Sequence, residues 1–126
     1  LQTWTEAYAP VVREAGGEPA LLMVWPEQSR MEAFDAVRDS YAGAADAVDG
    51  IFIPAGEAWR EAWSLDPDVP LYGVDGFHPS RDGSLVAALT VFAILFDEDV
   101  RELPADLYDS TRLETLYEAV HATVSR

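Results

Sequence analysis

The stretch ALLMVW, residues 20–25, decides the fold class of this chain. It is apolar at every position and is bounded by Pro19 and Pro26. A short run that is apolar on both faces is typical of a strand buried in a parallel sheet, because helices cover both sides of such a sheet. A second short run, IFI at residues 51–53, is closed by Pro54 in the same way. These two runs predict two buried strands.

Helices are predicted before, between and after the two strands. Apolar residues recur at steps of three and four over residues 1–15 and 30–48, which is the pattern of an amphipathic helix. A shorter helix is predicted over residues 56–64. Two more are predicted, over residues 81–96 and, after a break at a proline, over residues 107–124.

The order of these elements predicts an α/β fold. Strands that alternate with helices predict right-handed crossovers and a parallel sheet. Two strands alone leave unpaired edges, which proteins usually cover or extend. The helices also present more apolar surface than two short strands cover. We therefore expect residues 1–126 to be a single partial domain, the C-terminal part of a larger α/β domain, with a helical extension over about residues 98–126.

Composition excludes several classes of function. The chain has 126 residues, which is the length of one domain, and 49% of them are hydrophobic. Its 23 acidic residues against 8 arginines, with no lysine, give a net charge of -15. This charge argues against nucleic acid or an anionic membrane surface as a partner, because both require a basic face. The apolar run at residues 85–96 is shorter than the roughly 20 residues that span a bilayer.

The sequence contains no cysteine, which excludes disulfides, a thiolate nucleophile and a cysteine metal cluster. A site made of His78 with Asp66, Asp68 and Asp75 would be a poor zinc set, since it holds one histidine. Beside proline, Asp66 and Asp68 are more simply explained as loop and turn residues. We expect no metal and no cofactor.

The stretch DGFHPS, residues 75–80, carries the strongest chemical signal. A carboxylate three residues before an imidazole in a turn can fold back and accept a hydrogen bond from Nδ1–H. That contact fixes the tautomer and leaves Nε2 as a general base. The competing interpretation is that His78 is a surface loop residue and Asp75 a turn former.

Residues 75–80, then Gly83 and an Ala/Leu-rich helix, resemble the last sequence block of the SGNH (GDSL-like) hydrolases. In that family an Asp stands three residues before a His, often followed by Pro, by a Gly and by a final helix. The order of strands and helices upstream is also similar to the second half of that fold, so the resemblance covers roughly residues 1–96.

The resemblance implies a three-layer α/β/α (flavodoxin-like) fold with a parallel sheet of about five strands. It implies a serine ester hydrolase that forms an acyl-enzyme and acts on a small-molecule ester. Within it, Asp75 matches the orienter and His78 the general base.

The family's remaining site residues are not present in this sequence. The family uses a Ser in a Gly-Asp-Ser motif, and its oxyanion hole takes a Gly and an Asn. This chain has no Asn and no Gly-Asp-Ser. The stretch RDSYA, residues 38–42, resembles that motif only weakly, because it lacks the leading Gly and falls inside a predicted helix. We expect the nucleophile upstream of residue 1, and the 126 residues alone to be inactive.

Other candidates are weaker. Trp25 ends the first predicted strand and is a candidate to line the substrate cleft, with core packing as the alternative. Trp59 and Trp63, one turn apart, are expected in the core. His121, on the last helix and far from any paired motif, is expected at the surface.

Two further interpretations stay open. One is a non-catalytic α/β binding module that has lost the nucleophile. The other is an unrelated α/β binding or regulatory domain, in which Asp75 and His78 would point apart into solvent.

Overall fold

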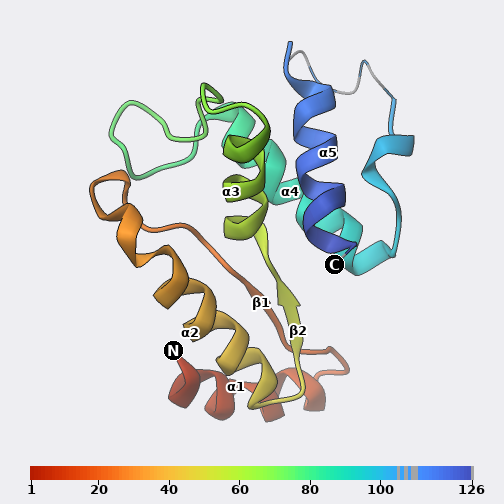
Figure 1. Ribbon diagram of the computed structural model, residues 1–126. Helices are drawn as coiled ribbons and strands as arrows, with labels where there is room; N and C mark the ends of the chain where they lie inside the picture. The colour runs from red at the N-terminus through yellow and green to blue at the C-terminus, as the bar shows by residue number, and fades with distance from the viewer. Residues whose placement is uncertain (105, 107, 109–110, 126) are drawn as a thin grey trace.

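The computed structural model describes residues 1–104, 106, 108 and 111–125. Within these residues the chain is a mixed α/β structure that is mostly helical and has a small parallel sheet (Figure 1). The elements in chain order are α1 (Gln2–Glu14), β1 (Ala20–Leu22), η1 (Gln28–Ala33), α2 (Phe34–Asp46), β2 (Ile51–Ile53), α3 (Ala55–Leu65), α4 (Arg81–Phe96), η2 (Val100–Glu102) and α5 (Leu113–Val124).

The two predicted strands pair with each other. β1 and β2 are parallel, and Ala20 lies opposite Ile51 in the register. Both strands are three residues long, so the strand predicted over residues 20–25 was too long at its C-terminal end. Pairing stops where β2 reaches Pro54 and the chain turns into α3. The parallel arrangement that the alternating elements predicted is confirmed.

The predicted helices are present, with two differences. In place of the helix predicted over residues 30–48, the 3-10 segment η1 extends to Ala33, with a non-helical backbone at Arg30 (φ -131, ψ 39), and the α-helix α2 runs from Phe34 to Asp46. The last helix begins at Leu113 rather than residue 107, and residues 107, 109 and 110 lie outside the described part of the chain.

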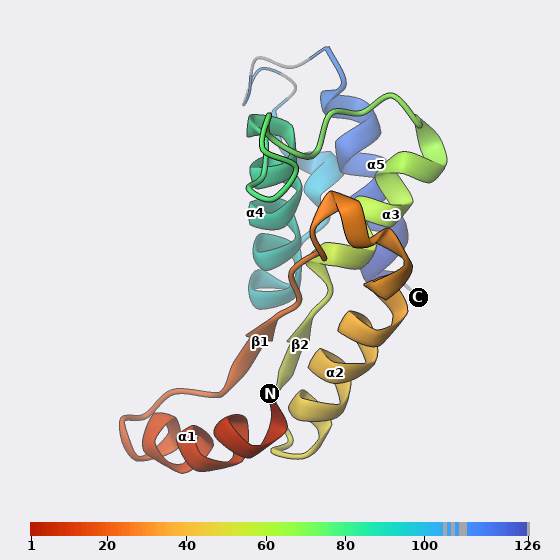
Figure 2. The ribbon, with the colours of Figure 1, turned by 90° about the vertical axis from the view of Figure 1, so that its left-hand side faces the viewer.

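The elements form two groups. Figures 1 and 2 show α3, α4 and α5 together at one end of the molecule, and α1, α2 and the two strands at the other. α2 packs along both strands, α1 packs on α2, and α3 contacts both α4 and α5. The main core lies in the three-helix group and includes Trp59, Leu71, Val86, Leu116 and Val120.

The group around the strands leaves apolar surface uncovered. The apolar face predicted for α1 is exposed at Trp4, Tyr8 and Val11, and Ala9 is the residue of this helix that is buried. Leu22 and Val24, at and beyond the end of β1, are also exposed. In the described part of the chain, β1 has a strand on one edge only. None of the described helices is both long and apolar enough to cross a bilayer.

Helix α4 begins where the backbone comes very close to the core. Ser80 is its N-cap, and the Ser80 hydroxyl accepts a hydrogen bond from the Gly83 N–H at 3.0 Å. A Cβ on Gly83 would overlap the carbonyl oxygen of Leu71 and stand 2.5 Å from Cζ2 of Trp59. The absent side chain therefore lets α4 start directly against α3.

We expect Gly83→Ala to lower the free energy of unfolding by about 1–3 kcal/mol, the usual cost of an extra methyl group in a packed core. Gly43→Ala is the matched control, because Gly43 lies in α2 and a Cβ there would meet no atom within 4 Å beyond the adjoining helix backbone. That variant should gain about 0.5–1 kcal/mol from helix propensity. Urea denaturation followed by circular dichroism measures both, and equal stability of the two variants would contradict the close contact.

Candidate functional site

The loop at residues 73–80, here named the histidine loop, is built around the carboxylate of Asp75. Its Oδ1 accepts hydrogen bonds from the backbone N–H groups of Phe77 and His78, both at 3.0 Å. These bonds fold the chain back over the carboxylate in a tight turn. Gly76 sits at the turn with φ +65, a conformation that glycine adopts without strain.

The same carboxylate orients the imidazole. Oδ2 of Asp75 lies 2.6 Å from Nδ1 of His78, which is a short, charge-assisted distance. The side chains are 49% and 73% exposed, respectively, so the imidazole is oriented by the loop while it stays accessible. In this arrangement Nδ1 carries the proton shared with Asp75, and Nε2 is the ring nitrogen left for another partner. Asp75 and His78 therefore point toward each other, and not apart into solvent.

The two ends of the histidine loop are joined. Tyr72 and Pro79 form an antiparallel bridge, and the Gly73 N–H donates to the His78 carbonyl at 2.8 Å. The Tyr72 hydroxyl donates to the carbonyl of Pro26 at 2.5 Å. Reasoning from the sequence missed this role of Tyr72. The partner is a backbone carbonyl 46 residues away, which no side-chain pattern reveals.

Trp25 lies at the histidine loop. Its indole Nε1–H donates to the Phe77 carbonyl at 3.3 Å, and its ring stacks on Trp59 with centroids 3.5 Å apart and planes 12° apart. One face of the Trp25 ring is therefore covered by protein. The structure brings Trp25 to the site, but as a packed neighbour of the loop.

The other candidates have structural roles. Trp59 is fully buried and Trp63 packs against the main core, as expected. Asp66 accepts from the Asp68 N–H and pairs with Arg112 at 2.9 Å, and the Arg112 hydrogen bond holds the pKa of this carboxyl below its usual range. Ser40 of the RDSYA stretch lies inside helix α2, as predicted, and it is exposed there. Across the described residues, no cluster of three or more His, Cys, Asp or Glu side chains is arranged to hold a metal ion.

His121 differs from the expectation. It is expected at the surface, yet its side chain is only 29% exposed, and its Nδ1 lies 3.3 Å from Oδ1 of Asp99. Asp99 also pairs with Arg101 at 2.6 Å, and this bond holds the pKa of Asp99 well below its usual range. The packing of α5 beside η2, and not local spacing, brings His121 to Asp99.

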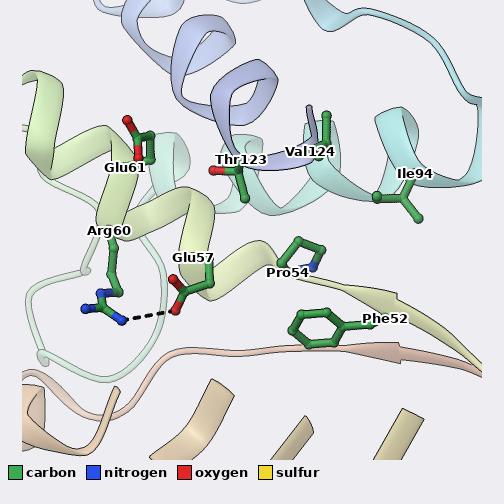
Figure 3. Close-up of a pocket in the computed structure, with 8 residues that line it drawn as sticks. All are labelled: Phe52, Pro54, Glu57, Arg60, Glu61, Ile94, Thr123 and Val124. Atoms are coloured by element: carbon green, nitrogen blue, oxygen red, sulfur yellow. Dashed lines mark hydrogen bonds and ion pairs between the residues drawn. The ribbon is translucent and has the colours of Figure 1, made fainter. Parts of the chain in front are cut away.

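A separate pocket lies between β2 and the ends of α4 and α5 (Figure 3). Two carboxylates of α3, Glu57 and Glu61, line it. Arg60 pairs with Glu57 at 3.2 Å and also with Asp35 at 2.8 Å. The Thr123 hydroxyl donates to the carbonyl of Ala119. None of the described residues that line the pocket is a histidine, so it offers no imidazole oriented by a carboxylate as the histidine loop does.

Comparison of this chain with known proteins bears on its fold class. No protein-family model and no curated protein matches this chain. A solved structure with the same α/β arrangement is that of a DUF4886 family protein from Bacteroides uniformis ATCC 8492, with a TM-score of 0.78 and 18% sequence identity. The match covers 99% of this chain and 57% of that protein. At this identity the similarity shows the fold alone, and the chain spans little more than half of its structural neighbour.

The hydrogen bonds to Asp75 set its titration. The hydrogen bond to the His78 imidazole, together with those from the Phe77 and His78 N–H groups, lowers its pKa to about 2. Because this pKa lies below the unfolded value of about 3.9, ionised Asp75 stabilises the fold above pH 4. We expect this contribution to be lost as the pH falls from about 4 to about 2.

The carboxyl resonance of Asp75, followed by NMR during acid titration, measures this pKa directly. In His78→Ala the pKa should rise because the imidazole bond is gone. It should remain below the ordinary value, because the two backbone N–H bonds persist. An ordinary pKa for Asp75 in the unmutated chain would contradict the geometry of the histidine loop.

Proposed function

We propose that this chain carries the base and orienter of a serine ester hydrolase of the SGNH type. His78 is the general base and Asp75 its orienter. The observation that carries the proposal is the 2.6 Å contact between Asp75 Oδ2 and His78 Nδ1 on an exposed imidazole. A purely structural pair would gain little from this exposure, because exposed ion pairs contribute weakly to stability.

The proposed chemistry uses the two ring nitrogens differently. Nε2 of His78 takes the proton from a serine hydroxyl as its oxygen attacks the ester carbonyl. The resulting imidazolium, stabilised by Asp75, gives that proton to the departing alkoxide and leaves an acyl-enzyme. Water then repeats the sequence and releases the acid. The proposal requires a serine nucleophile and an oxyanion hole made by a Gly and an Asn, and the 126 residues contain no Asn and no Gly-Asp-Ser.

Three observations support a larger sheet within a three-layer α/β/α fold around this site. The free edge of β1 is a template for another strand, and unpaired edges are usually covered. The exposed apolar residues Trp4, Tyr8, Leu22 and Val24 lie on α1 and at β1, where further sheet and helix would bury them. The structural neighbour is also longer than the part that matches this chain.

In the protein encoded by the complete reading frame, we expect His78→Ala to lower kcat for ester hydrolysis about 10²–10⁴-fold, the usual contribution of a general base. Asp75→Ala should cost less, because an orienter acts through the base. His121→Ala is the matched control, since it removes the chain's other histidine, which also pairs with an aspartate. Wild-type activity in His78→Ala would overturn the assignment of the base.

The 126-residue chain by itself should hydrolyse ester only slowly. Its rate should exceed that of its His78→Ala variant only by the weak catalysis that an imidazole gives without a nucleophile. A nitrophenyl ester assay of both proteins measures this. If the complete reading frame encodes neither Gly-Asp-Ser nor Asn upstream, the non-catalytic binding module becomes the better interpretation.

A further inference from the structure

We propose that Trp25 is a positioning residue for His78, and that it acts through the peptide group between Phe77 and His78. This role rests on the proposed function only where it treats His78 as a base. The contacts themselves stand on the geometry of the histidine loop.

The peptide group between Phe77 and His78 is held at both ends. Its carbonyl oxygen accepts from the Trp25 indole at 3.3 Å, and its N–H donates to Oδ1 of Asp75 at 3.0 Å. A peptide group is planar, so fixing both its oxygen and its N–H fixes its orientation. That orientation sets the position of the His78 Cα, and with it the line along which the imidazole meets the Asp75 carboxylate.

The donor on Trp25 is itself held in place. Its ring stacks on Trp59, which is fully buried. Trp59 in turn donates from its indole Nε1 to the carbonyl of Gly83 at 3.0 Å, in the first turn of α4. The two stacked indoles, named here the indole pair, thus bond one carbonyl in the histidine loop and one in the helix that follows it.

This arrangement explains how an exposed imidazole is held in one orientation. His78 itself is largely exposed and has little packing to hold it. The hydrogen bonds of Asp75 and Trp25 hold it instead, and the stack on the buried Trp59 ring keeps the Trp25 donor in place. Trp25 contributes a directed N–H donor, which a phenylalanine of similar shape would lack.

Trp25→Phe in the 126-residue chain tests the role. It keeps an aromatic ring against Trp59 and removes the donor to Phe77. We expect the His78 amide to exchange with solvent about 2- to 12-fold faster, which corresponds to the loss of one neutral hydrogen bond. The ¹⁵N shifts of the two His78 ring nitrogens, which report the tautomer, should move away from the Nδ1–H form.

Trp63→Phe is the matched control. It also removes an indole donor to a backbone carbonyl, that of Val69 at 3.0 Å, but it leaves the Trp25–Phe77 bond in place. Its His78 ring shifts and amide exchange should match those of the unmutated chain. Identical His78 ring shifts in Trp25→Phe and the unmutated chain would overturn the proposal, as would equal effects of the two variants.

A second measurement leaves Trp25 intact, in case Trp25→Phe does not fold. If Trp25 and Asp75 hold the same peptide group, Asp75→Ala should speed solvent exchange of the Trp25 indole N–H, because linkage is reciprocal. Unchanged exchange of this proton would contradict the role.

In the complete protein, Trp25→Phe should lower kcat for ester hydrolysis by the same factor of about 2 to 12 with KM unchanged. If the complete protein is inactive but the exchange and tautomer changes occur, the proposed function fails and the positioning role stands. If the protein is active and Trp25→Phe leaves both kcat and the His78 ring shifts unchanged, the positioning role fails alone.

Discussion

The contact of Trp59 with the backbone at Gly83 is the constraint on which the rest of the structure depends. The indole lies fully buried where a methyl group on Gly83 would not fit. Its N–H donates to the Gly83 carbonyl in the first turn of α4, its ring stacks on that of Trp25, and it lies nearly perpendicular to the Tyr72 ring, with centroids 5.0 Å apart. One side chain of α3 thus contacts α4, the segment that follows β1 and the residue that leads into the histidine loop, so a disturbance there reaches all of them.

The histidine loop obtains its order from hydrogen bonds and not from burial. Asp75 satisfies two backbone N–H groups with one oxygen and the imidazole with the other. Such bonds leave both side chains open to solvent, which a reacting group requires. In a chain with a net charge of -15, a carboxylate that is held ionised by its own loop needs no neighbouring arginine to fix it.

Sequence reasoning predicted those features that depend on local pattern. The strands, the parallel pairing, helix α4 and the Asp75–His78 pair follow from periodicity or short spacing, and the structure contains each of them. It missed what depends on distant contacts. The approach of His121 to Asp99 and the tie from Tyr72 to Pro26 arise when packed helices or loops meet. The break in helical geometry at Arg30, inside η1, is a backbone conformation that helical periodicity does not encode.

The separation of partners along the chain also bears on how the site forms during folding. Asp75 and His78 are three residues apart, so their hydrogen bond closes a very short loop. Trp25 and Phe77 are 52 residues apart, and their contact requires the strand end and α3 to have come together first. Closing a long loop is slow compared with forming a local turn. The Asp75–His78 pair can therefore form early, whereas the contact of Trp25 with Phe77 forms late. The hydrogen bond between Asp75 and His78 can thus form before the core is complete. The orientation that Trp25 gives to the backbone beside His78 requires the finished core.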